Sequence, residues 1–500
     1  MSVINRTMYP VQSSMDLIAR MQSQFNTLQQ QLSTGLKANS LAEMGSDRYF
    51  DIAIRSRLTR LDGYDTNITM VNSRLDMFDQ ITSRLGDIEQ DARGLITPSA
   101  YGSQDVILGS APVQAQANLD EVINLLNSDI NGRYLFGGGV TDKRPVADMD
   151  AILNGAGGKA GFKQVASERQ QADVGDGLGR LQFDTTVPGT VTLKEDGDHP
   201  FGFKLGTVTS NSAAVTITQP NGTAPQSLSV QFTAQPNAGE TISIGLTLPD
   251  GTTDQVTLKA VTGTPGAGEF QIGADPNATA DNFKTALQAS LTREGATTLV
   301  AASNNAAAEN FFSASGTQVM RVPGPGFATA TSLTPADPTT MVLWYTGGDS
   351  TDPRASIQAR IDDSQTVNYG AQANESGTLN LVRALAVLSI QNFDASDPNT
   401  EGKFDAVASR NVDRLSAMHA SEKGSIEMVG IELNNAKVQV GDIKSRHSDY
   451  TAQLQGMLAD IENAPEEEVA ASILALQTRL QATYQTTSLV SQLSLVNYIK

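Results

Sequence analysis

The sequence predicts an α + β multidomain protein, in which long N- and C-terminal helices pack as a coiled coil or helical bundle and the middle of the chain forms a β-rich insert. Three observations indicate this fold class. Apolar residues recur with helical spacing near both ends, heptad repeats follow inside them, and the middle of the chain is rich in Thr, Gly, Asn, Pro and Val.

The 500 residues suffice for about three domains at ~150 residues each. We expect terminal assembly helices formed by residues 1–40 and 464–500. A helical rod domain would consist of residues 41–160 and 345–463. Residues 161–344 would form the β-rich insert, with one or two subdomains. The family resemblance described below implies that the terminal helices make an inner layer and that the insert faces outward.

The two terminal helices are predicted from apolar residues spaced by threes, fours or sums of them, the period of one helix face. Pro10 is expected to mark the start of the first helix or a kink in it, and Pro465 precedes the last helix. The predicted assembly interface consists of the apolar residues of these tails: Ile4, Met8, Val11, Met15, Ile18, Phe25, Leu28, Leu32, Leu476, Leu480, Tyr484, Leu489, Leu493, Leu495 and Tyr498.

A single tail of this kind has no core of its own, and an isolated helix of its length is marginal in water. Two tails that pack on each other, and on tails of neighbouring subunits, offset the entropy that is lost on ordering them. An ordinary helical hairpin packed on its own domain is the alternative that the pattern leaves open.

Heptad repeats predict the inner helices. One helix is expected over residues 48–95, with a length of ~70 Å at ~1.5 Å per residue, ended by Pro98 and Gly102. A third helix is expected over residues 104–130. The strongest repeat runs from Val412 to Ile461 and predicts one long rod.

Strands are predicted where short apolar runs alternate with turn signals such as Asn221-Gly222. One amphipathic helix, near residues 280–293, is expected among them. The predicted strands are residues 191–193, 214–217, 228–232, 242–248 and 255–258.

Charge and cysteine content exclude several functions. The net charge is 35 − 54 = −19, so the chain is a poor ligand for nucleic acid or for an anionic membrane surface. The absence of cysteine excludes disulfides, thiolate catalysis and Cys-based zinc sites. The first residues lack the pattern of a Sec signal, which indicates either the cytoplasm or an export route that leaves the leader uncleaved.

Catalytic and ligand-binding patterns do not emerge from the sequence, so we expect no enzyme activity, no metal and no cofactor. Of three histidines, His419 and His447 fall on the heptad and are expected to pack. A phosphate-binding glycine loop follows a buried strand and begins a helix. The glycines at 137–139 do neither, and they are predicted to form a turn.

At the end of the third predicted helix stand Gly132, Arg133, Tyr134, Leu135, Phe136, Gly137 and Gly138. This turn resembles the signature of the flagellar hook–filament junction proteins, which belong to the bacterial flagellin family. The opening at residues 21–35 looks like the flagellin-family N-terminus. The endings at 480–487 and 493–499 are similar to those of the junction proteins.

The resemblance covers residues 1–145 and 345–500. Residues 171–181 also look like a segment found in alphaproteobacterial members of the family. The resemblance therefore predicts that the protein comes from an alphaproteobacterium. Residues 44–49 depart from the family, because they lack the proline usual before the second helix. The start of that helix is therefore left open.

The resemblance implies a secreted structural subunit of the bacterial flagellum that joins hook to filament by self-assembly through its terminal helices. Its implied partners are further copies of itself in a ring or helical lattice, the other hook-associated protein, flagellin and a flagellar export chaperone. Neither nucleic acid nor membrane insertion is expected. The alternatives are flagellin, the filament subunit, and an exported enzyme carried in the insert.

Overall fold

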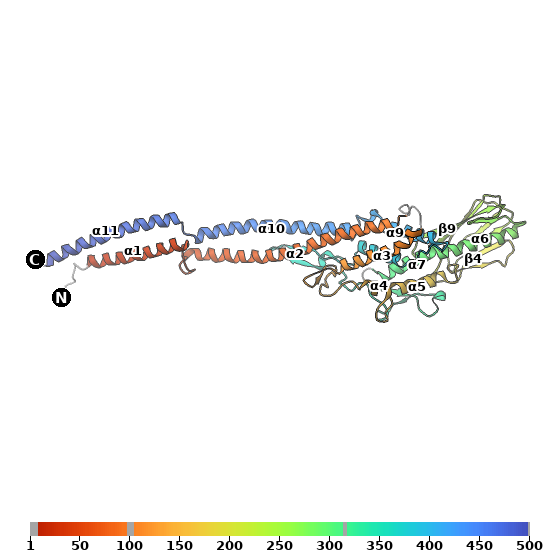
Figure 1. Cartoon of the computed structure of the whole chain (residues 1–500), viewed down its shortest axis with the longest axis horizontal. Coiled ribbons are helices and arrows are strands. Elements are labelled where there is room, and N and C mark those ends of the chain that lie inside the picture. The colour runs from red at the N-terminus through yellow and green to blue at the C-terminus, as the bar shows by residue number, and fades with distance from the viewer. Residues whose placement is uncertain (1–8, 98–104, 314–317, 499–500) are drawn as a thin grey trace. The chain divides into compact units, whose positions relative to one another are not determined.

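A computed structural model describes residues 9–97, 105–313 and 318–498 (Figure 1). The chain divides into two compact units. The terminal unit comprises Met1–Met70, Arg360–Thr366 and Gln439–Lys500, and the central unit comprises Val71–Ala359 and Val367–Val438. Helices dominate both ends of the chain and strands its middle, so the predicted α + β class is confirmed.

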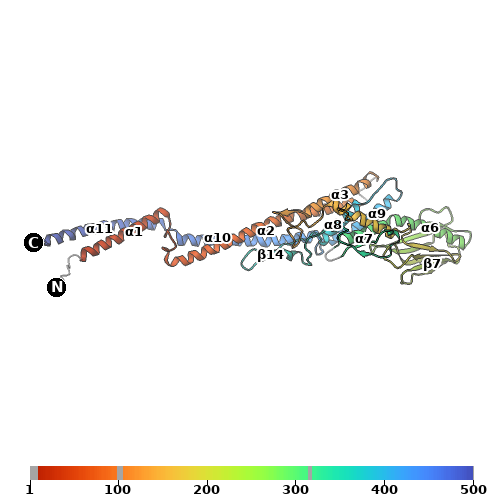
Figure 2. The same ribbon diagram turned by 90° about the horizontal axis from the view of Figure 1, so that it is seen from below.

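In the terminal unit, α1 (Tyr9–Thr34) lies beside α11 (Glu466–Tyr498), as Figures 1 and 2 both show. Their contact is apolar: Phe25 and Leu28 of α1 pack on Val469 and Ile473 of α11. Helix α1 ends where Gly35 takes a positive φ of 70° and donates its N–H to the Gln31 carbonyl at 2.8 Å. This left-handed residue is a common helix C-terminus that glycine adopts without strain.

The segments that follow α1 and precede α11 pair with each other. The N–H of Lys37 donates to the Glu462 carbonyl at 2.7 Å, and the N–H of Ala464 donates to the Gly35 carbonyl at 2.8 Å. Leu36 and Asn463 thereby form an antiparallel bridge. These two hydrogen bonds join the end of α1 to the start of α11 through their linkers.

The long helices α2 (Arg48–Leu95) and α10 (Ile426–Glu462) each contribute residues to both units. Within the terminal unit, Ile54 and Leu61 of α2 pack with Leu454 of α10. Helix α2 has the predicted bounds and follows the short helix η1 (Gly45–Asp47), so it starts at Arg48 without the family's proline. Pro98 and Gly102 lie outside the described residues.

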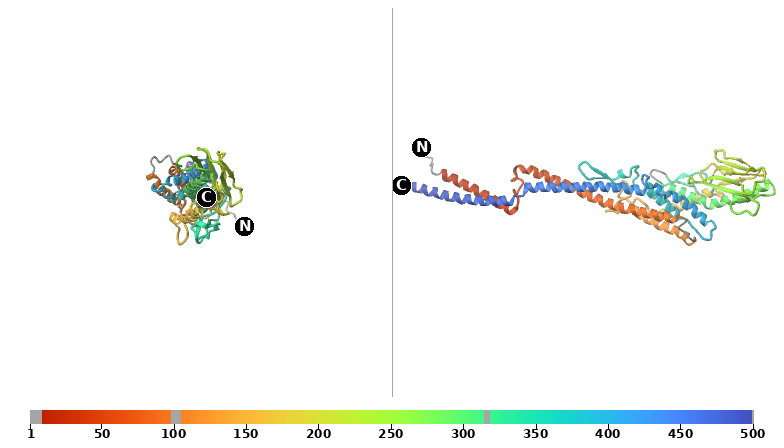
Figure 3. Two further views of the ribbon diagram at one scale, coloured as in Figure 1. Left: turned by 90° about the vertical axis from the view of Figure 1, so that its right-hand side faces the viewer. Right: turned by 90° about the horizontal axis from the view of Figure 1, so that it is seen from above.

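The central unit contains two four-stranded sheets that share one apolar core with α6 (Pro276–Ala296). Figure 3 shows these strands and helix, in yellow to green, beside one another. Pairing is antiparallel except between β9 and β10. The first sheet has the order β3 (Leu181–Asp184), β4 (Thr190–Glu195), β7 (Ser227–Phe232), β6 (Val215–Thr218). The second has the order β10 (Glu269–Gln271), β9 (Thr253–Val261), β8 (Thr241–Thr247), β5 (Lys204–Ser210).

Further helices complete the central unit. The close pairs are α3 with α8 and α5 with α7. The helices are α3 (Asp105–Leu126), α4 (Met149–Asn154), α5 (Phe162–Val174), α7 (Thr298–Phe311), α8 (Ser376–Ser389) and α9 (Thr400–Arg414). The connections contain three short helices, η3 (Phe327–Thr329), η4 (Arg354–Ser356) and η5 (Ala417–His419). They also contain two small sheets, β11 (Met320–Arg321) with β12 (Thr334–Pro335) and β13 (Gln358–Arg360) with β14 (Thr366–Asn368).

Three sequence predictions need correction. The rod expected from Val412 is broken between α9 and α10, where Ser416 caps η5 and Gly424 has a φ of 82°. The third helix ends at Leu126 because a hairpin begins at Asp129. The insert contains α5 and α7 in addition to the one helix that was expected.

The aromatic contacts in the insert's core lead to a stability prediction. Phe283 of α6 meets Phe232 and Phe270 edge to face, with ring centroids 5.5 Å and 5.3 Å away. Phe283→Ala should lower the free energy of unfolding by about 3–5 kcal/mol, because it leaves a cavity between α6 and both sheets. Denaturant titration measures this change. Val187→Ala, at an exposed site, is the control, and equal stability of the two variants would contradict the packing.

Candidate assembly interface

The tail residues predicted from the sequence divide into two groups on the α1–α11 pair. Leu476 is buried, and Ile18, Phe25, Leu28 and Leu480 are half-buried. The exposed group consists of Met15, Leu32, Tyr484 and Leu489. The rest lie outside the described residues (Ile4, Met8) or in helix whose side chains are not described (Val11, Leu493, Leu495, Tyr498).

Periodicity also missed members of both groups. Met21 is buried between the helices and continues the spacing from Ile18 to Phe25, so the sequence pattern could have identified it. Leu17 and Leu474 are exposed, the latter by 65%. Their exposure could not be read from spacing, because it depends on which neighbours the helix has.

The surface of the helix pair carries few charges. Helix α1 has only Asp16 and Arg20, and beyond its first turn α11 has only Arg479. The polar link between the helices that is described is neutral, with the Gln22 amide donating to the Tyr484 hydroxyl at 2.8 Å. We name Met15, Leu17, Leu32, Leu474, Tyr484, Leu489 and Val490 the exposed tail face. An apolar surface with so little charge is typical of a protein–protein contact.

A second exposed apolar cluster stands at the start of α2, where Tyr49, Phe50 and Ile52 face solvent. The rings of Tyr49 and Phe50 meet edge to face with centroids 5.7 Å apart. The sequence analysis did not identify this cluster, because its residues do not follow the heptad seam.

Ion pairs hold the helical part of the terminal unit in place. Arg55 pairs with Glu462 and, at 3.1 Å, with Asp51. The hydrogen bonds that Arg55 donates to Glu462 and Asp51 raise the pKa of its guanidinium group. The hydroxyl of Tyr64 donates to Asp363 at 3.0 Å, which lowers the pKa of the Asp363 carboxyl and attaches its loop to α2.

The turn that resembles the family signature is a hairpin of β1 (Asp129–Ile130) and β2 (Arg133–Tyr134). Asn131 and Gly132 have φ values of 55° and 75°, the backbone of a two-residue type I′ turn. The next residues enter the core: Leu135 and Phe136 are buried, and Phe136 meets Phe78 of α2 with ring centroids 5.3 Å apart.

The glycines of this turn let two other segments approach. The N–H of Gly138 donates to the Ala371 carbonyl at 2.9 Å, and the Gly137 carbonyl accepts the N–H of Gly348 at 2.8 Å. A Cβ on Gly137 would lie 2.2 Å from the Val140 carbonyl oxygen. The backbone contacts of the turn are therefore structural ones within the central unit.

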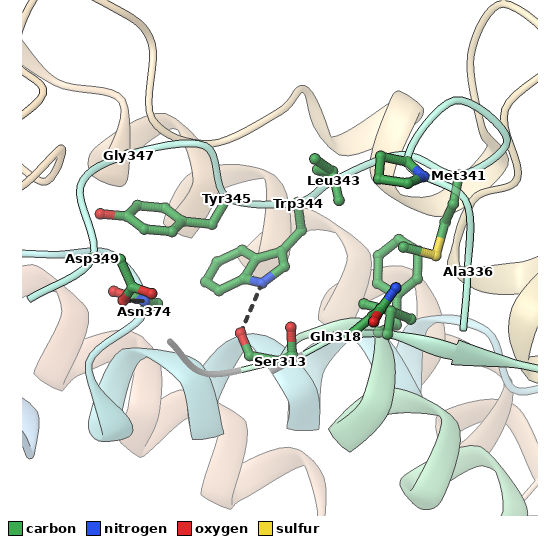
Figure 4. A pocket seen from close by; sticks show the side chains of 13 residues that line it. Ser313, Gln318, Ala336, Met341, Leu343, Trp344, Tyr345, Gly347, Asp349 and Asn374 are labelled. Atoms are coloured by element: carbon green, nitrogen blue, oxygen red, sulfur yellow. Dashed lines mark hydrogen bonds between the residues drawn. The ribbon is translucent and has the colours of Figure 1, made fainter. Parts of the chain in front are cut away.

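A small pocket lies beside the segment that Gly137 holds (Figure 4). Its volume is about 270 Å³ and its walls include Met341, Trp344 and Tyr345. The Trp344 indole N–H donates to the Ser313 carbonyl at 3.4 Å. Burial raises the pKa of Tyr345, whose hydroxyl donates to the Gly348 carbonyl at 2.7 Å. Among its described lining residues, Asp349 is the one carboxylate and there is no histidine.

Two other kinds of site were sought in the described ranges. No group of three or more His, Asp or Glu side chains there is arranged to hold a metal ion. Over the same ranges, no helix has the length and apolar character needed to span a bilayer.

The tight contact at Gly137 predicts a matched pair of variants. Gly137→Ala should destabilise the central unit by about 1–3 kcal/mol, because the new methyl group overlaps a backbone oxygen that the turn holds in place. Gly139→Ala is the control, since the nearest atom to its Cβ is 3.8 Å away. Thermal unfolding of both variants checks the result, and equal midpoints would show that the turn relaxes freely.

Comparison with known proteins now adds to the geometry. Residues 4–141 match the model of the bacterial flagellin N-terminal helical region. Curated proteins give no match. Ten solved chains match, among them flagellar hook-associated protein 3 of Legionella pneumophila, which is 13% identical with a TM-score of 0.31 over 82% of this chain and 98% of that one. The N-terminal helical region of the chain therefore resembles that of bacterial flagellin.

Proposed function

We propose that this protein is the secreted subunit that joins the hook to the filament of the bacterial flagellum, and that it self-assembles through its terminal helices. The observation that carries self-assembly is the exposed tail face. Met15, Leu474 and Leu489 are each exposed by more than half, at 60%, 65% and 59%. Burying side chains of this size stabilises a contact by roughly 1–2 kcal/mol each, after allowance for the part already buried.

Two faces of one helix pair thus have two roles. Phe25, Leu28 and Ile473 hold α1 to α11 within a chain, while the exposed tail face receives the tails of neighbouring copies. A helix pair that leaves several apolar side chains exposed and carries few charges is stabilised further when those side chains are buried in an assembly. The division of the chain into inner tails, helical rod and outer insert is part of this proposal.

The choice of the junction over the filament rests on the turn at residues 132–138 and on the ending at 493–499, both of which resemble junction proteins. Flagellin remains the second candidate, because the matched N-terminal helical region is that of flagellin. The partners proposed with the junction role are further copies, the other hook-associated protein, flagellin and an export chaperone. Export would follow the flagellar type III pathway. No enzymatic step is part of the role.

Deletion of the gene separates the two candidates. A junction protein's loss should leave hooks without filaments and release flagellin monomer into the medium, which electron microscopy and immunoblotting measure. If flagellin disappears together with the filaments, the chain is the filament subunit. Normal filaments on the deletion strain would contradict both roles.

Neighbouring residues on α11 test the two faces of the tail pair. Leu474→Asp should leave the secreted chain helical but abolish filament attachment, because it charges the exposed tail face. Ile473→Asp should instead reduce the helix content of the monomer, since Ile473 packs on α1. Circular dichroism of the secreted protein and filament counts on the complemented deletion strain report both effects. Normal filament numbers with Leu474→Asp would refute assembly through this face.

A further inference from the structure

A groove of about 620 Å³ runs along the α2–α10 helix pair inside the terminal unit. Helix α2 contributes Thr59, Asp62 and Asp65 to its wall, and α10 contributes His447, Ser448 and Thr451. The groove lies on the helical part of the unit, and neither the exposed tail face nor the turn at 132–138 includes any of its residues.

His447 in this groove has two ring nitrogens that form no hydrogen bond with the described residues. Its side chain is buried, with 6% of the residue exposed. Its Nε2 lies 3.6 Å from Oδ1 of Asp362, and its ring lies 5.9 Å from that of Tyr64. A buried ring nitrogen without a partner costs free energy, which a ligand in the groove would recover.

The groove wall is rich in hydrogen-bond acceptors. The carboxylates of Asp62 and Asp65 are exposed on α2, and both lack an ion pair within the described part of the chain. The hydroxyl oxygens of the wall add further acceptors, and the unpartnered nitrogens of His447 lie beside them, while Lys444 is the one lysine or arginine among the described lining residues. A guanidinium group fits such a wall, because it carries five donors and no acceptor.

Arginines of suitable position occur at the start of the same helix. Helix α2 has Arg48, Arg55, Arg57 and Arg60 before the two aspartates. Arg55 and Arg60 are engaged with carboxylates of their own chain. Arg48 and Arg57 are exposed; Arg57 lies over the Tyr450 ring, with its Cζ 5.3 Å from the centroid.

The exposed arginines Arg48 and Arg57 thus lie N-terminal to the two unpaired aspartates on the same helix. Complementary charges at two places on one surface can pair head to tail between copies, and such a contact repeats along an assembly. A second copy supplies the arginine at the local concentration that the tails already provide.

We propose that the groove between α2 and α10 receives an arginine side chain, Arg48 or Arg57, from a second copy of this chain. The inference rests on the self-assembly proposed above and names a second contact for it, on the helical part of the terminal unit. It accounts for three features together: the unpartnered ring of His447, the unpaired aspartates and the exposed arginines.

A charge-exchange experiment in the deletion strain tests the contact. One variant carries Asp62→Arg and Asp65→Arg, and the other carries Arg48→Glu and Arg57→Glu. Each alone should reduce filament number at least tenfold, although the protein is still secreted. Expressed together, they should restore filaments to near the wild-type number. The arginines introduced into the groove of the first variant then meet the glutamates at positions 48 and 57 of the second. The unchanged aspartates of the second variant meet the unchanged Arg48 and Arg57 of the first.

Asp442→Arg with Asp449→Arg is the control, since both residues are exposed on α10 outside the groove and the net charge changes equally. The control should assemble as the wild type does. Normal filaments with the Asp62/Asp65 variant, loss of filaments with the control, or failure of the mixture would each overturn the contact. If Leu474→Asp still blocks assembly in those cases, the tail mechanism stands and the groove contact alone is refuted.

Circular dichroism of the secreted variants guards against misfolding. His447→Leu gives an independent measurement, because leucine suits a heptad seam and lacks a ring nitrogen. It should keep the helix content of the monomer and lower filament number severalfold. Unchanged filament number with His447→Leu would show that the ring does not bind the partner and would overturn its part in the contact.

Discussion

The packing of α1 on α11 is the interaction on which the rest of the account depends. It uses one apolar face of each helix, with Phe25 and Leu28 against Val469 and Ile473, and it leaves a second set of apolar side chains exposed to water. The first face gives the monomer two ordered ends. The second makes those ends incomplete alone, because exposed apolar area is stabilised only when another surface covers it.

Heptad spacing predicted the long helices well, because apolar residues that recur at the period of the helix turn all lie on one face of the helix. Helix α2 was predicted with its observed bounds, and the seam of α10 from Ile426 to Leu454 is buried as expected. The same spacing continued through Leu415 into η5, where the chain is not continuous helix. Periodicity does not register the cap at Ser416 or the left-handed Gly424, which stop a helix locally.

The insert and the site were less predictable, for a related reason. Strand positions at β4, β6, β7, β8 and β9 followed from short apolar runs between turns, but α7 is rich in alanine and asparagine and gave no amphipathic signal. Which apolar tail residues are exposed depends on three-dimensional neighbours, so Leu474 could not be distinguished from Ile473 by spacing. The unpartnered ring of His447 was visible only once α2 and α10 were paired.

The absence of cysteine permits one direct measurement of the central claim, that the exposed tail face is covered on assembly. A Leu474→Cys chain carries a single thiol, whose labelling by a maleimide can be compared between secreted monomer and isolated flagella. The account predicts rapid labelling in the monomer and at least tenfold slower labelling in flagella. Equal rates in both states would contradict it.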